Sequence, residues 1–390
     1  MPVDATRQGR ASLACAASAE AYTPPSRQGG STELSALEQF SMVIPDSFVH
    51  SMNAKAHSLK SGTVSRRIVA GIMANPTSFG RMKFSIEQAR LFKREGLGPQ
   101  ENDTLQVCKA LVNVAGIMLE DIVSDPSGRV SIEVDPRVAY DTDALVAQGE
   151  LIWSMCAENW ISKDRILVQM PATWEAIEAA GRLELQGLET HLTGIYSYGQ
   201  AVAACNHGVS VISINVGRIH DWYDKNPGAV RDPTGPRETQ AMAKAGYGGP
   251  LQNPGIPLVK KIYTYIHHAG GRTKIIASGM RTKKETLALA GCDYLVVGEH
   301  ILKSLAATST LDGYNDGLSA QQQYAGGISP AMSPDQAAAS EVEKVSVASA
   351  NFKDALGLIG SDLLSSDIER SIEDARRLEP IFMNRVGGQE

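Results

Sequence analysis

From about residue 43 onward the chain alternates short apolar runs with longer segments in which apolar residues recur every three to four positions. Short apolar runs between turn residues are typical of buried strands, and the longer spacing is typical of helices. The helical segments include residues 143–157, 174–186 and 283–290. The candidate strands are residues 42–45, 68–73, 129–134, 166–170, 190–195, 209–214, 273–278 and 294–297.

Strands that alternate with helices indicate βαβ units and a parallel sheet. Eight such strands favour a closed barrel over an open doubly wound sheet, so we expect a single (β/α)8 TIM barrel in the α/β class. No GxGxxG motif follows the first strand, which weakens a dinucleotide-binding interpretation.

The pattern divides the chain into four parts. Residues 1–33 are rich in small and polar residues without periodicity, and we expect a disordered tail. Residues 34–307 hold the barrel, and residues 308–340, rich in Gly, Ser, Ala and Gln, are predicted to be a linker. Residues 341–390 form a C-terminal helical extension. Its helix, at about residues 366–378, has apolar spacing that would pack on the barrel or on a second subunit of a homodimer.

One Gly- and Pro-rich segment, residues 224–257, follows the sixth candidate strand. Barrels place their active-site loops after the strands, so we interpret this segment as a lid or substrate loop. An ordinary long insertion is the alternative.

Composition narrows the classes of partner. The formal net charge is −6, which argues against a nucleic-acid partner, and no apolar stretch is long enough to predict a membrane span. The five cysteines are scattered without a CxxC motif, which indicates reduced thiols and a cytoplasmic location. A transit peptide in the Arg- and Ser-rich tail is the less favoured alternative.

Two carboxylates stand at strand ends, where barrels place their reacting side chains. Glu133 lies among apolar neighbours, in which a carboxylate is costly unless it is hydrogen-bonded or functional, so we assign it an acid–base role against the alternative of a buried structural carboxylate. Asp46 follows the first strand and fits either a catalytic acid or a helix cap.

Arginines follow strands six and seven in matching positions. Arg218 comes after the strand that carries Ser213, and Arg281 comes after the strand that ends at Ser278. Two arginines near backbone amides at helix starts suit a phosphate dianion. We therefore predict a phosphate site in which these four residues bind a small phosphorylated or otherwise anionic substrate.

Several longer motifs resemble transaldolases, in the order that family has them along its barrel. They are residues 128–135 (GRVSIEVD), 162–168 (SKDRILV) with 172–174 (ATW), 192–193 (LT) with 196–198 (YSY), 216–219 (VGRI) with 221–223 (DWY), and 290–293 (AGCD). The resemblance covers roughly residues 35–305. Asn75, which precedes a proline, resembles the family's Asn-Pro after strand two, and Asp46 falls where the family has a strand-one aspartate.

The resemblance implies an activity in the pentose phosphate pathway. Transaldolases move a dihydroxyacetone unit between sugar phosphates through a Schiff base to a strand-four lysine. An aspartate, a glutamate and a threonine-held water assist that lysine, and the matching residues here are Asp46, Glu133 and Thr193. The family's phosphate arginines match Arg218 and Arg281.

The lysine itself is missing. The strand-four motif reads ILVQMPA, with Gln169 in the lysine's place, and an amide cannot form an imine. His191 stands where the family has an asparagine, and Gly279 where it has a serine. Lys274 lies toward the N-terminal end of its strand and is not expected to substitute. His191 is interpreted as a general acid or base in a rebuilt site, or else as a packed polar residue.

Three functions remain open at this point. The favoured one is an altered enzyme, a transferase or lyase of the transaldolase family, that uses non-covalent acid–base chemistry at Glu133, Gln169 and His191. The second is a non-catalytic binding or scaffold protein, and the third is an ordinary transaldolase. No cofactor and no metal site is predicted, because the histidines are too scattered to assert one.

Overall fold

In the computed structural model, the described residues are 32–46, 61–74, 79–121, 123, 127–227, 229, 253–309, 332–342 and 345–383. The strands are β1 (Met42–Pro45), β2 (Ser61–Val64), β3 (Arg129–Glu133), β4 (Ile166–Pro171), β5 (Thr190–Thr193), β6 (Val211–Asn215), β7 (Lys274–Ser278) and β8 (Tyr294–Val297).

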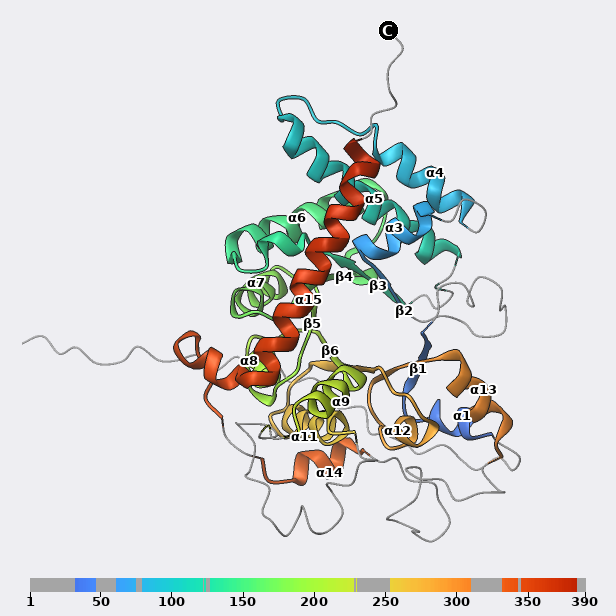
Figure 1. Cartoon of the computed structure of the whole chain (residues 1–390), viewed down its shortest axis with the longest axis vertical. Coiled ribbons are helices and arrows are strands. Elements are labelled where there is room, and N and C mark those ends of the chain that lie inside the picture. Colours follow the sequence, from blue (N-terminus) through green and yellow to red (C-terminus); the bar gives the residue numbers. More distant parts are fainter. Residues whose placement is uncertain are drawn as a thin grey trace, which may run out of the picture.

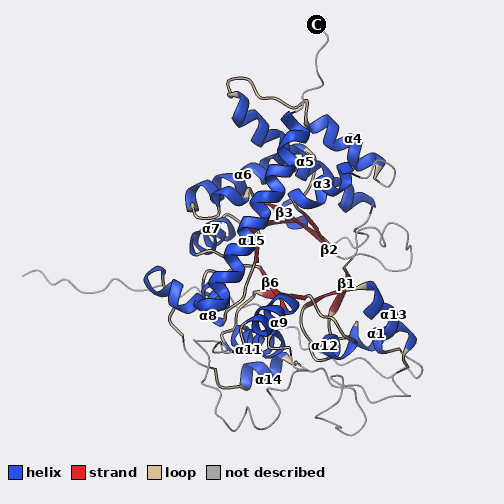
Figure 2. Cartoon of the chain, in the orientation of Figure 1, coloured by secondary structure: helices blue, strands red, loops and turns tan. Residues whose placement is uncertain are grey.

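The eight strands form one parallel sheet with the order β1-β8-β7-β6-β5-β4-β3-β2. The sheet curves into a nearly closed barrel with the helices around it (Figure 2). The predicted TIM barrel is confirmed, and because all strands are parallel, their C-terminal ends meet at one rim.

Helices follow most strands. They are α1 (Glu33–Leu37), α3 (Arg66–Ala74), α4 (Gly80–Ala89), α5 (Pro99–Asp121), α6 (Thr142–Glu158), α7 (Trp174–Leu185), α8 (Tyr198–Asn206), α9 (Val216–Lys225), α11 (Gly255–His268), α12 (Lys283–Leu287), α13 (Glu299–Ala307), α14 (Pro334–Ala339) and α15 (Phe352–Met383). Short 3-10 turns are η1 (Pro136–Val138), η2 (Lys163–Arg165) and η4 (Ser349–Asn351). None of the described helices is long and apolar enough to span a bilayer.

The second predicted strand is wrong. Residues 68–73 belong to helix α3, and the second strand is β2, which ends at Val64, four positions before the predicted range begins. The buried side chains of α3 are Arg66, Val69 and Ile72, which recur every three residues as one helical face. β2 carries a single large apolar side chain, Val64, so the alternation of apolar and polar residues that marks a strand cannot be recognised in the sequence.

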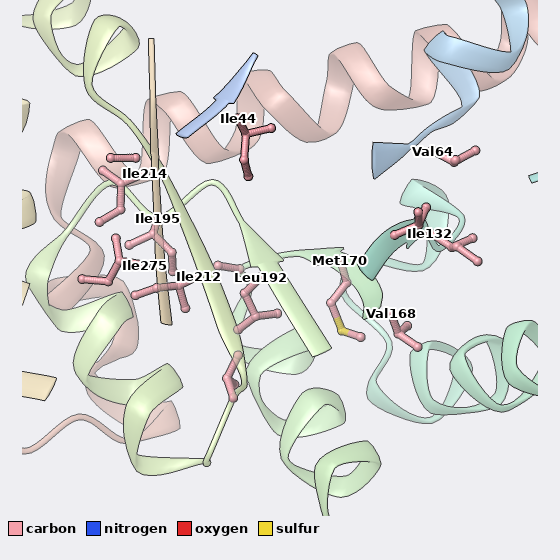
Figure 3. Close-up of a cluster of buried hydrophobic side chains, with 14 of the residues drawn as sticks. Ile44, Val64, Ile132, Val168, Met170, Leu192, Ile195, Ile212, Ile214 and Ile275 are labelled. Atoms are coloured by element: carbon pink, nitrogen blue, oxygen red, sulfur yellow. The ribbon is translucent and has the colours of Figure 1, made fainter. Parts of the chain in front are cut away.

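The outer faces of the strands carry the main core. Ile132, Val168, Leu192 and Ile212 are almost fully buried and belong to the cluster of apolar side chains drawn in Figure 3. Alternate strand positions point to opposite faces of a sheet, so the residues between these lie inside the barrel. Several of those inner residues are polar, and they form the site described below.

Helix α15 extends the predicted C-terminal helix at both ends. It crosses one end of the barrel and contacts α3, α8, η1, α9 and β4 (red in Figure 1). Gly357 interrupts it with φ of 66°. The predicted linker includes helix α14, which packs on α11. Residues 1–31, residues 230–252 of the predicted lid and Asn75 lie outside the described residues.

Candidate active site

Three polar residues stand side by side on adjacent strands. Glu133 of β3 is paired in register with Gln169 of β4, and Gln169 is paired with His191 of β5. Register partners in a parallel sheet point to the same face. The strand order therefore brings together three of the predicted catalytic residues.

His191 shows that this face is the barrel interior. Its Nδ1 is 2.9 Å from the hydroxyl of Ser131 on β3, and its Nε2 is 2.5 Å from the hydroxyl of Ser213 on β6. A side chain of β5 reaches strands on both sides only by pointing inward. Burial lowers the pKa of His191 to about 4, so the ring is neutral at physiological pH. Both ring nitrogens are engaged by the barrel wall.

Gln169 carries an unused acceptor. Its side-chain oxygen Oε1 is buried and accepts no hydrogen bond from any described residue. The only lysine in the eight described strands is Lys274, which begins β7 at its N-terminal end. Its Nζ lies 2.9 Å from a carboxylate oxygen of Asp293. No described strand therefore supplies an amine beside Gln169.

Glu133 is held by a buried arginine. The backbone N–H of Arg66 donates to Oε2 of Glu133 at 2.9 Å, and its guanidinium lies 3.5 Å from the same oxygen. The guanidinium also donates to the carbonyl of Val134 at 2.6 Å and lies 3.5 Å from Asp135. Burial raises the pKa of Glu133, although the positive charge of Arg66 opposes that shift.

The pKa of the neighbouring Asp135 is lowered, whereas that of Glu133 is raised. Burial alone would raise this pKa, but hydrogen bonds from Arg137 and the charge of Arg66 lower it below its usual range. Two adjacent carboxylates thus differ in their affinity for a proton, which is a common arrangement at acid–base sites.

The remaining predicted catalytic residues lie at the same rim. Thr193 ends β5, is paired in register with Pro171, and its hydroxyl donates to the carbonyl of Met170 at 3.4 Å. Asp46 is exposed just after β1, where its backbone N–H donates to Val297.

Arg218 occupies the first turn of α9, as the sequence predicts, but its guanidinium is already engaged. It forms an ion pair with Asp367 of α15 and donates to the hydroxyls of Tyr196, at 3.3 Å, and Ser366, at 3.4 Å. Tyr196 in turn donates its hydroxyl to the other oxygen of Asp367. The predicted phosphate arginine therefore holds a carboxylate of its own chain.

Arg281 points to a different partner. Its guanidinium is 2.5 Å from Asp221 of α9 and donates to the carbonyl of Gly217 at 3.4 Å. The loops that carry Arg218 and Arg281 are adjacent, but the two guanidinium groups bind different carboxylates. Of the predicted serines, Ser213 is bonded to His191, and Ser278 is the register partner of Asn215.

Gly279 is required by the geometry of this loop. Its φ is +77°, a conformation that favours glycine, and a Cβ there would lie 2.2 Å from Oδ1 of Asn215. That oxygen accepts the backbone N–H of Arg218 at 3.0 Å and caps α9. The amide of Asn215 thus takes the space that a side chain at position 279 would need.

A cavity of about 430 Å³ lies next to the site, beyond Asp135. Its lining residues include Asp103, Gln148 and Glu379, contributed by α5, α6 and α15. The side chain of Gln148 accepts the backbone N–H of Asp135 at 2.6 Å. This cavity contains none of the predicted site residues.

Sequence reasoning did not identify Arg66 or Asp367. Arg66 begins helix α3, two positions before the range that the sequence predicted as a strand, so no helix start was expected there. Asp367 is 149 positions after Arg218, and no local pattern reports such a contact. The only signal for it is the amphipathic spacing of the helix that carries it.

Comparisons with known proteins agree with this architecture. Residues 53–378 match the family described as transaldolase/fructose-6-phosphate aldolase. The chain is 30% identical over 375 residues to a transaldolase of Rattus norvegicus, and 29% identical over 375 residues to a transaldolase of Homo sapiens. Both matches cover 94% of this chain and 98% of the relative. The family match covers β2 to β8 and most of α15, and the chain belongs to the transaldolase/fructose-6-phosphate aldolase family.

Proposed function

We propose that this protein binds a phosphorylated, sugar-type substrate at the C-terminal rim of the barrel and acts on it by non-covalent acid–base chemistry. The observation that carries the proposal is the alignment of Glu133, Gln169 and His191 on three adjacent strands. In that row the glutamine stands where the family resemblance requires the Schiff-base lysine.

Glu133 is the acid–base group in this proposal. Its carboxylate would remove a proton from the carbon next to the substrate carbonyl, and the electron pair of that C–H bond would move onto the carbonyl oxygen as an enolate. Burial raises the pKa of Glu133, which makes its carboxylate a stronger base than an exposed one. Enolisation, isomerisation or elimination could follow from the same first step.

Gln169 would orient the substrate. Its amide nitrogen can donate to the developing enolate oxygen, and its unsatisfied Oε1 can accept from a substrate hydroxyl. A buried acceptor without a partner costs free energy, which supports a ligand hydroxyl at this place.

His191 is assigned a positioning role. Its two nitrogens link β3 to β6 through Ser131 and Ser213, and burial favours the neutral ring. It would fix β3, which carries Glu133, relative to β5 and β6. This replaces the general acid or base that the sequence suggested.

A non-catalytic binding protein is the second candidate. The observation that favours it is the ion pair between Arg218 and Asp367, which engages the predicted phosphate arginine in the ligand-free chain. Such a protein would bind a sugar phosphate without changing it.

Fructose 6-phosphate in D₂O separates these functions. We expect the native protein to exchange substrate protons next to the carbonyl for deuterium, as followed by NMR, and Glu133→Gln to lose the exchange. Borohydride should trap no adduct with the native protein, whereas Gln169→Lys should give a trapped adduct detected by mass spectrometry. Binding without exchange would favour the non-catalytic function. A trapped adduct on the native chain, or turnover with erythrose 4-phosphate, would refute the proposal.

A further inference from the structure

We infer that Asp367 is an internal competitor for the substrate's phosphate at Arg218, and that it thereby determines which anions the site accepts. The inference rests on the proposed function, because it assumes that Arg218 binds the phosphate. It assigns a specificity-determining role to a residue of the C-terminal helix.

The first support is the set of groups around the Asp367 carboxylate. One oxygen pairs with the guanidinium of Arg218 and lies 4.0 Å from that of Arg370, and the other accepts the hydroxyl of Tyr196. Ser366 adds a second hydroxyl within reach of Arg218. Two guanidinium groups and a tyrosine hydroxyl around one oxyanion are the kind of donors that a phosphate group would use.

The second support is position. Helix α15 contacts β4 and also η1, α8 and α9, which begin after the C-terminal ends of β3, β5 and β6. Asp367 therefore reaches Arg218 from the mouth of the barrel, the side from which a substrate would enter.

The third support is that α15 is fixed in place. A Cβ at Gly194, just after β5, would lie 3.0 Å from Leu364 and 3.8 Å from Asp367. One turn earlier on the helix, Asp362 accepts the indole N–H of Trp222 at 3.1 Å. The carboxylate of Asp367 is thus a built part of the site and not a mobile surface group.

The charges around Asp367 determine how strongly the site binds a phosphate dianion. Arg218 and Arg370 together carry two positive charges, and the ionised Asp367 leaves a net charge of one for an incoming dianion. A phosphate must also displace the carboxylate or lie beside it, and like charges in close contact are costly. The native site should therefore bind a phosphate dianion weakly, and removal of the Asp367 charge should strengthen that binding.

Titration calorimetry with fructose 6-phosphate tests this inference, with fructose as the unphosphorylated comparison. We expect Asp367→Asn to bind fructose 6-phosphate about tenfold or more tightly than the native protein. The gain should disappear when Arg218→Met is added. Asp362→Asn is the matched control, because it removes the same charge from the same helix without touching an arginine, and it should bind as the native protein does.

Equal affinity in the native protein, Asp367→Asn and Asp362→Asn would overturn the inference but leave the proposed function intact. A failure of every variant to bind at millimolar concentration would instead refute the proposed phosphate site. Asp367→Ser, which retains a small hydrogen-bonding side chain, gives the same comparison if Asp367→Asn does not fold by circular dichroism. Tighter binding in Asp367→Ser supports the competitor, and unchanged binding overturns it.

Discussion

Glu133 and Gln169 are register partners at the C-terminal ends of β3 and β4, so a carboxyl group stands beside a side-chain amide. Arg66, which follows β2, holds that carboxyl group from the other side with both its backbone N–H and its guanidinium. The carboxyl group of Glu133 thus lies between Arg66, which follows β2, and Gln169 of β4. No described strand places a lysine next to it.

The first prediction concerns the buried pair of Arg66 and Glu133. Arg66→Met should lower the free energy of unfolding by about 3 kcal/mol at pH 7, because it leaves Glu133 and Asp135 buried without their shared cation. The loss should shrink as the pH falls, since protonation relieves the uncompensated charge. Urea denaturation at pH 7 and pH 5 measures both effects.

A double-mutant cycle separates pairing from packing. Arg66→Met combined with Glu133→Gln should lose at least about 1 kcal/mol less than the sum of the two single changes. Additive losses would mean that Arg66 stabilises the fold through its carbonyl contact with Val134 and not through the carboxylate.

The residues of this site that the sequence predicts are those with a local signal, and contacts between residues far apart in the sequence are not predicted. Glu133 is a local signal, because a carboxylate inside an apolar strand is costly, whereas His191 stands out only through the resemblance to transaldolases. The row they form with Gln169 follows from strand order, which the alternation of strands and helices predicts. Arg66 was missed because the short strand before it has too little apolar pattern to recognise, and the helix that carries it was taken for that strand.

Asp367 could not be predicted for a different reason. Amphipathic spacing indicates that the C-terminal helix packs on something, but not where. Docking over the rim is decided by many contacts at once, among them the Trp222–Asp362 hydrogen bond and the packing of Leu364 over Gly194. The orientation of Arg218 toward α15 follows from that docking.

The second prediction concerns His191 and pH. Its pKa in the folded protein is about 4, below the value of 6.5 for an unfolded histidine, so the unfolded chain takes up a proton first as the pH falls. The stabilisation is therefore complete above pH 6.5 and is lost as the pH falls through 4. Between pH 7 and pH 5 this one group should remove about 2 kcal/mol from the free energy of unfolding.

His191→Gln is the comparison for this effect, because an amide can bond to both serines and does not titrate. The native protein should lose more stability than the variant between pH 7 and pH 5, as measured by urea denaturation. Parallel pH profiles for the two proteins would show that His191 titrates normally in the fold, contrary to its burial between Ser131 and Ser213.

The third prediction compares the two predicted phosphate arginines. Arg218→Met should weaken binding of fructose 6-phosphate about tenfold or more, whereas Arg281→Met should weaken it less. The side chain of Arg218 is 20% exposed and that of Arg281 is 48% exposed, so water screens the second charge more strongly. Because native binding is expected to be weak, the measurement is made in the Asp367→Asn background.

Arg272→Met is the matched control for this series. Arg272 precedes β7 at the opposite end of the barrel and pairs with Glu184 at 3.0 Å, so its loss changes the net charge equally without touching the rim. Binding that is unchanged in both rim variants would remove the phosphate clamp from the proposal.

The last prediction concerns the loop that orients Arg218. Gly279→Ser adds a side chain at a φ of +77°, which costs about 1 kcal/mol by itself. The new Cβ also displaces the amide of Asn215, so the cap on α9 is lost at a further cost of about 1 kcal/mol. Gly270→Ser measures the cost of the positive φ alone, because Gly270 has a φ of +64° and no atom lies within 4 Å of the added Cβ. We therefore expect Gly279→Ser to lower the free energy of unfolding about twice as much as Gly270→Ser.

Equal losses of stability in chemical denaturation would contradict this prediction. They would mean that the side chain of Asn215 can rotate away without weakening α9, so that Gly279 is not needed to keep Arg218 in the first turn of that helix.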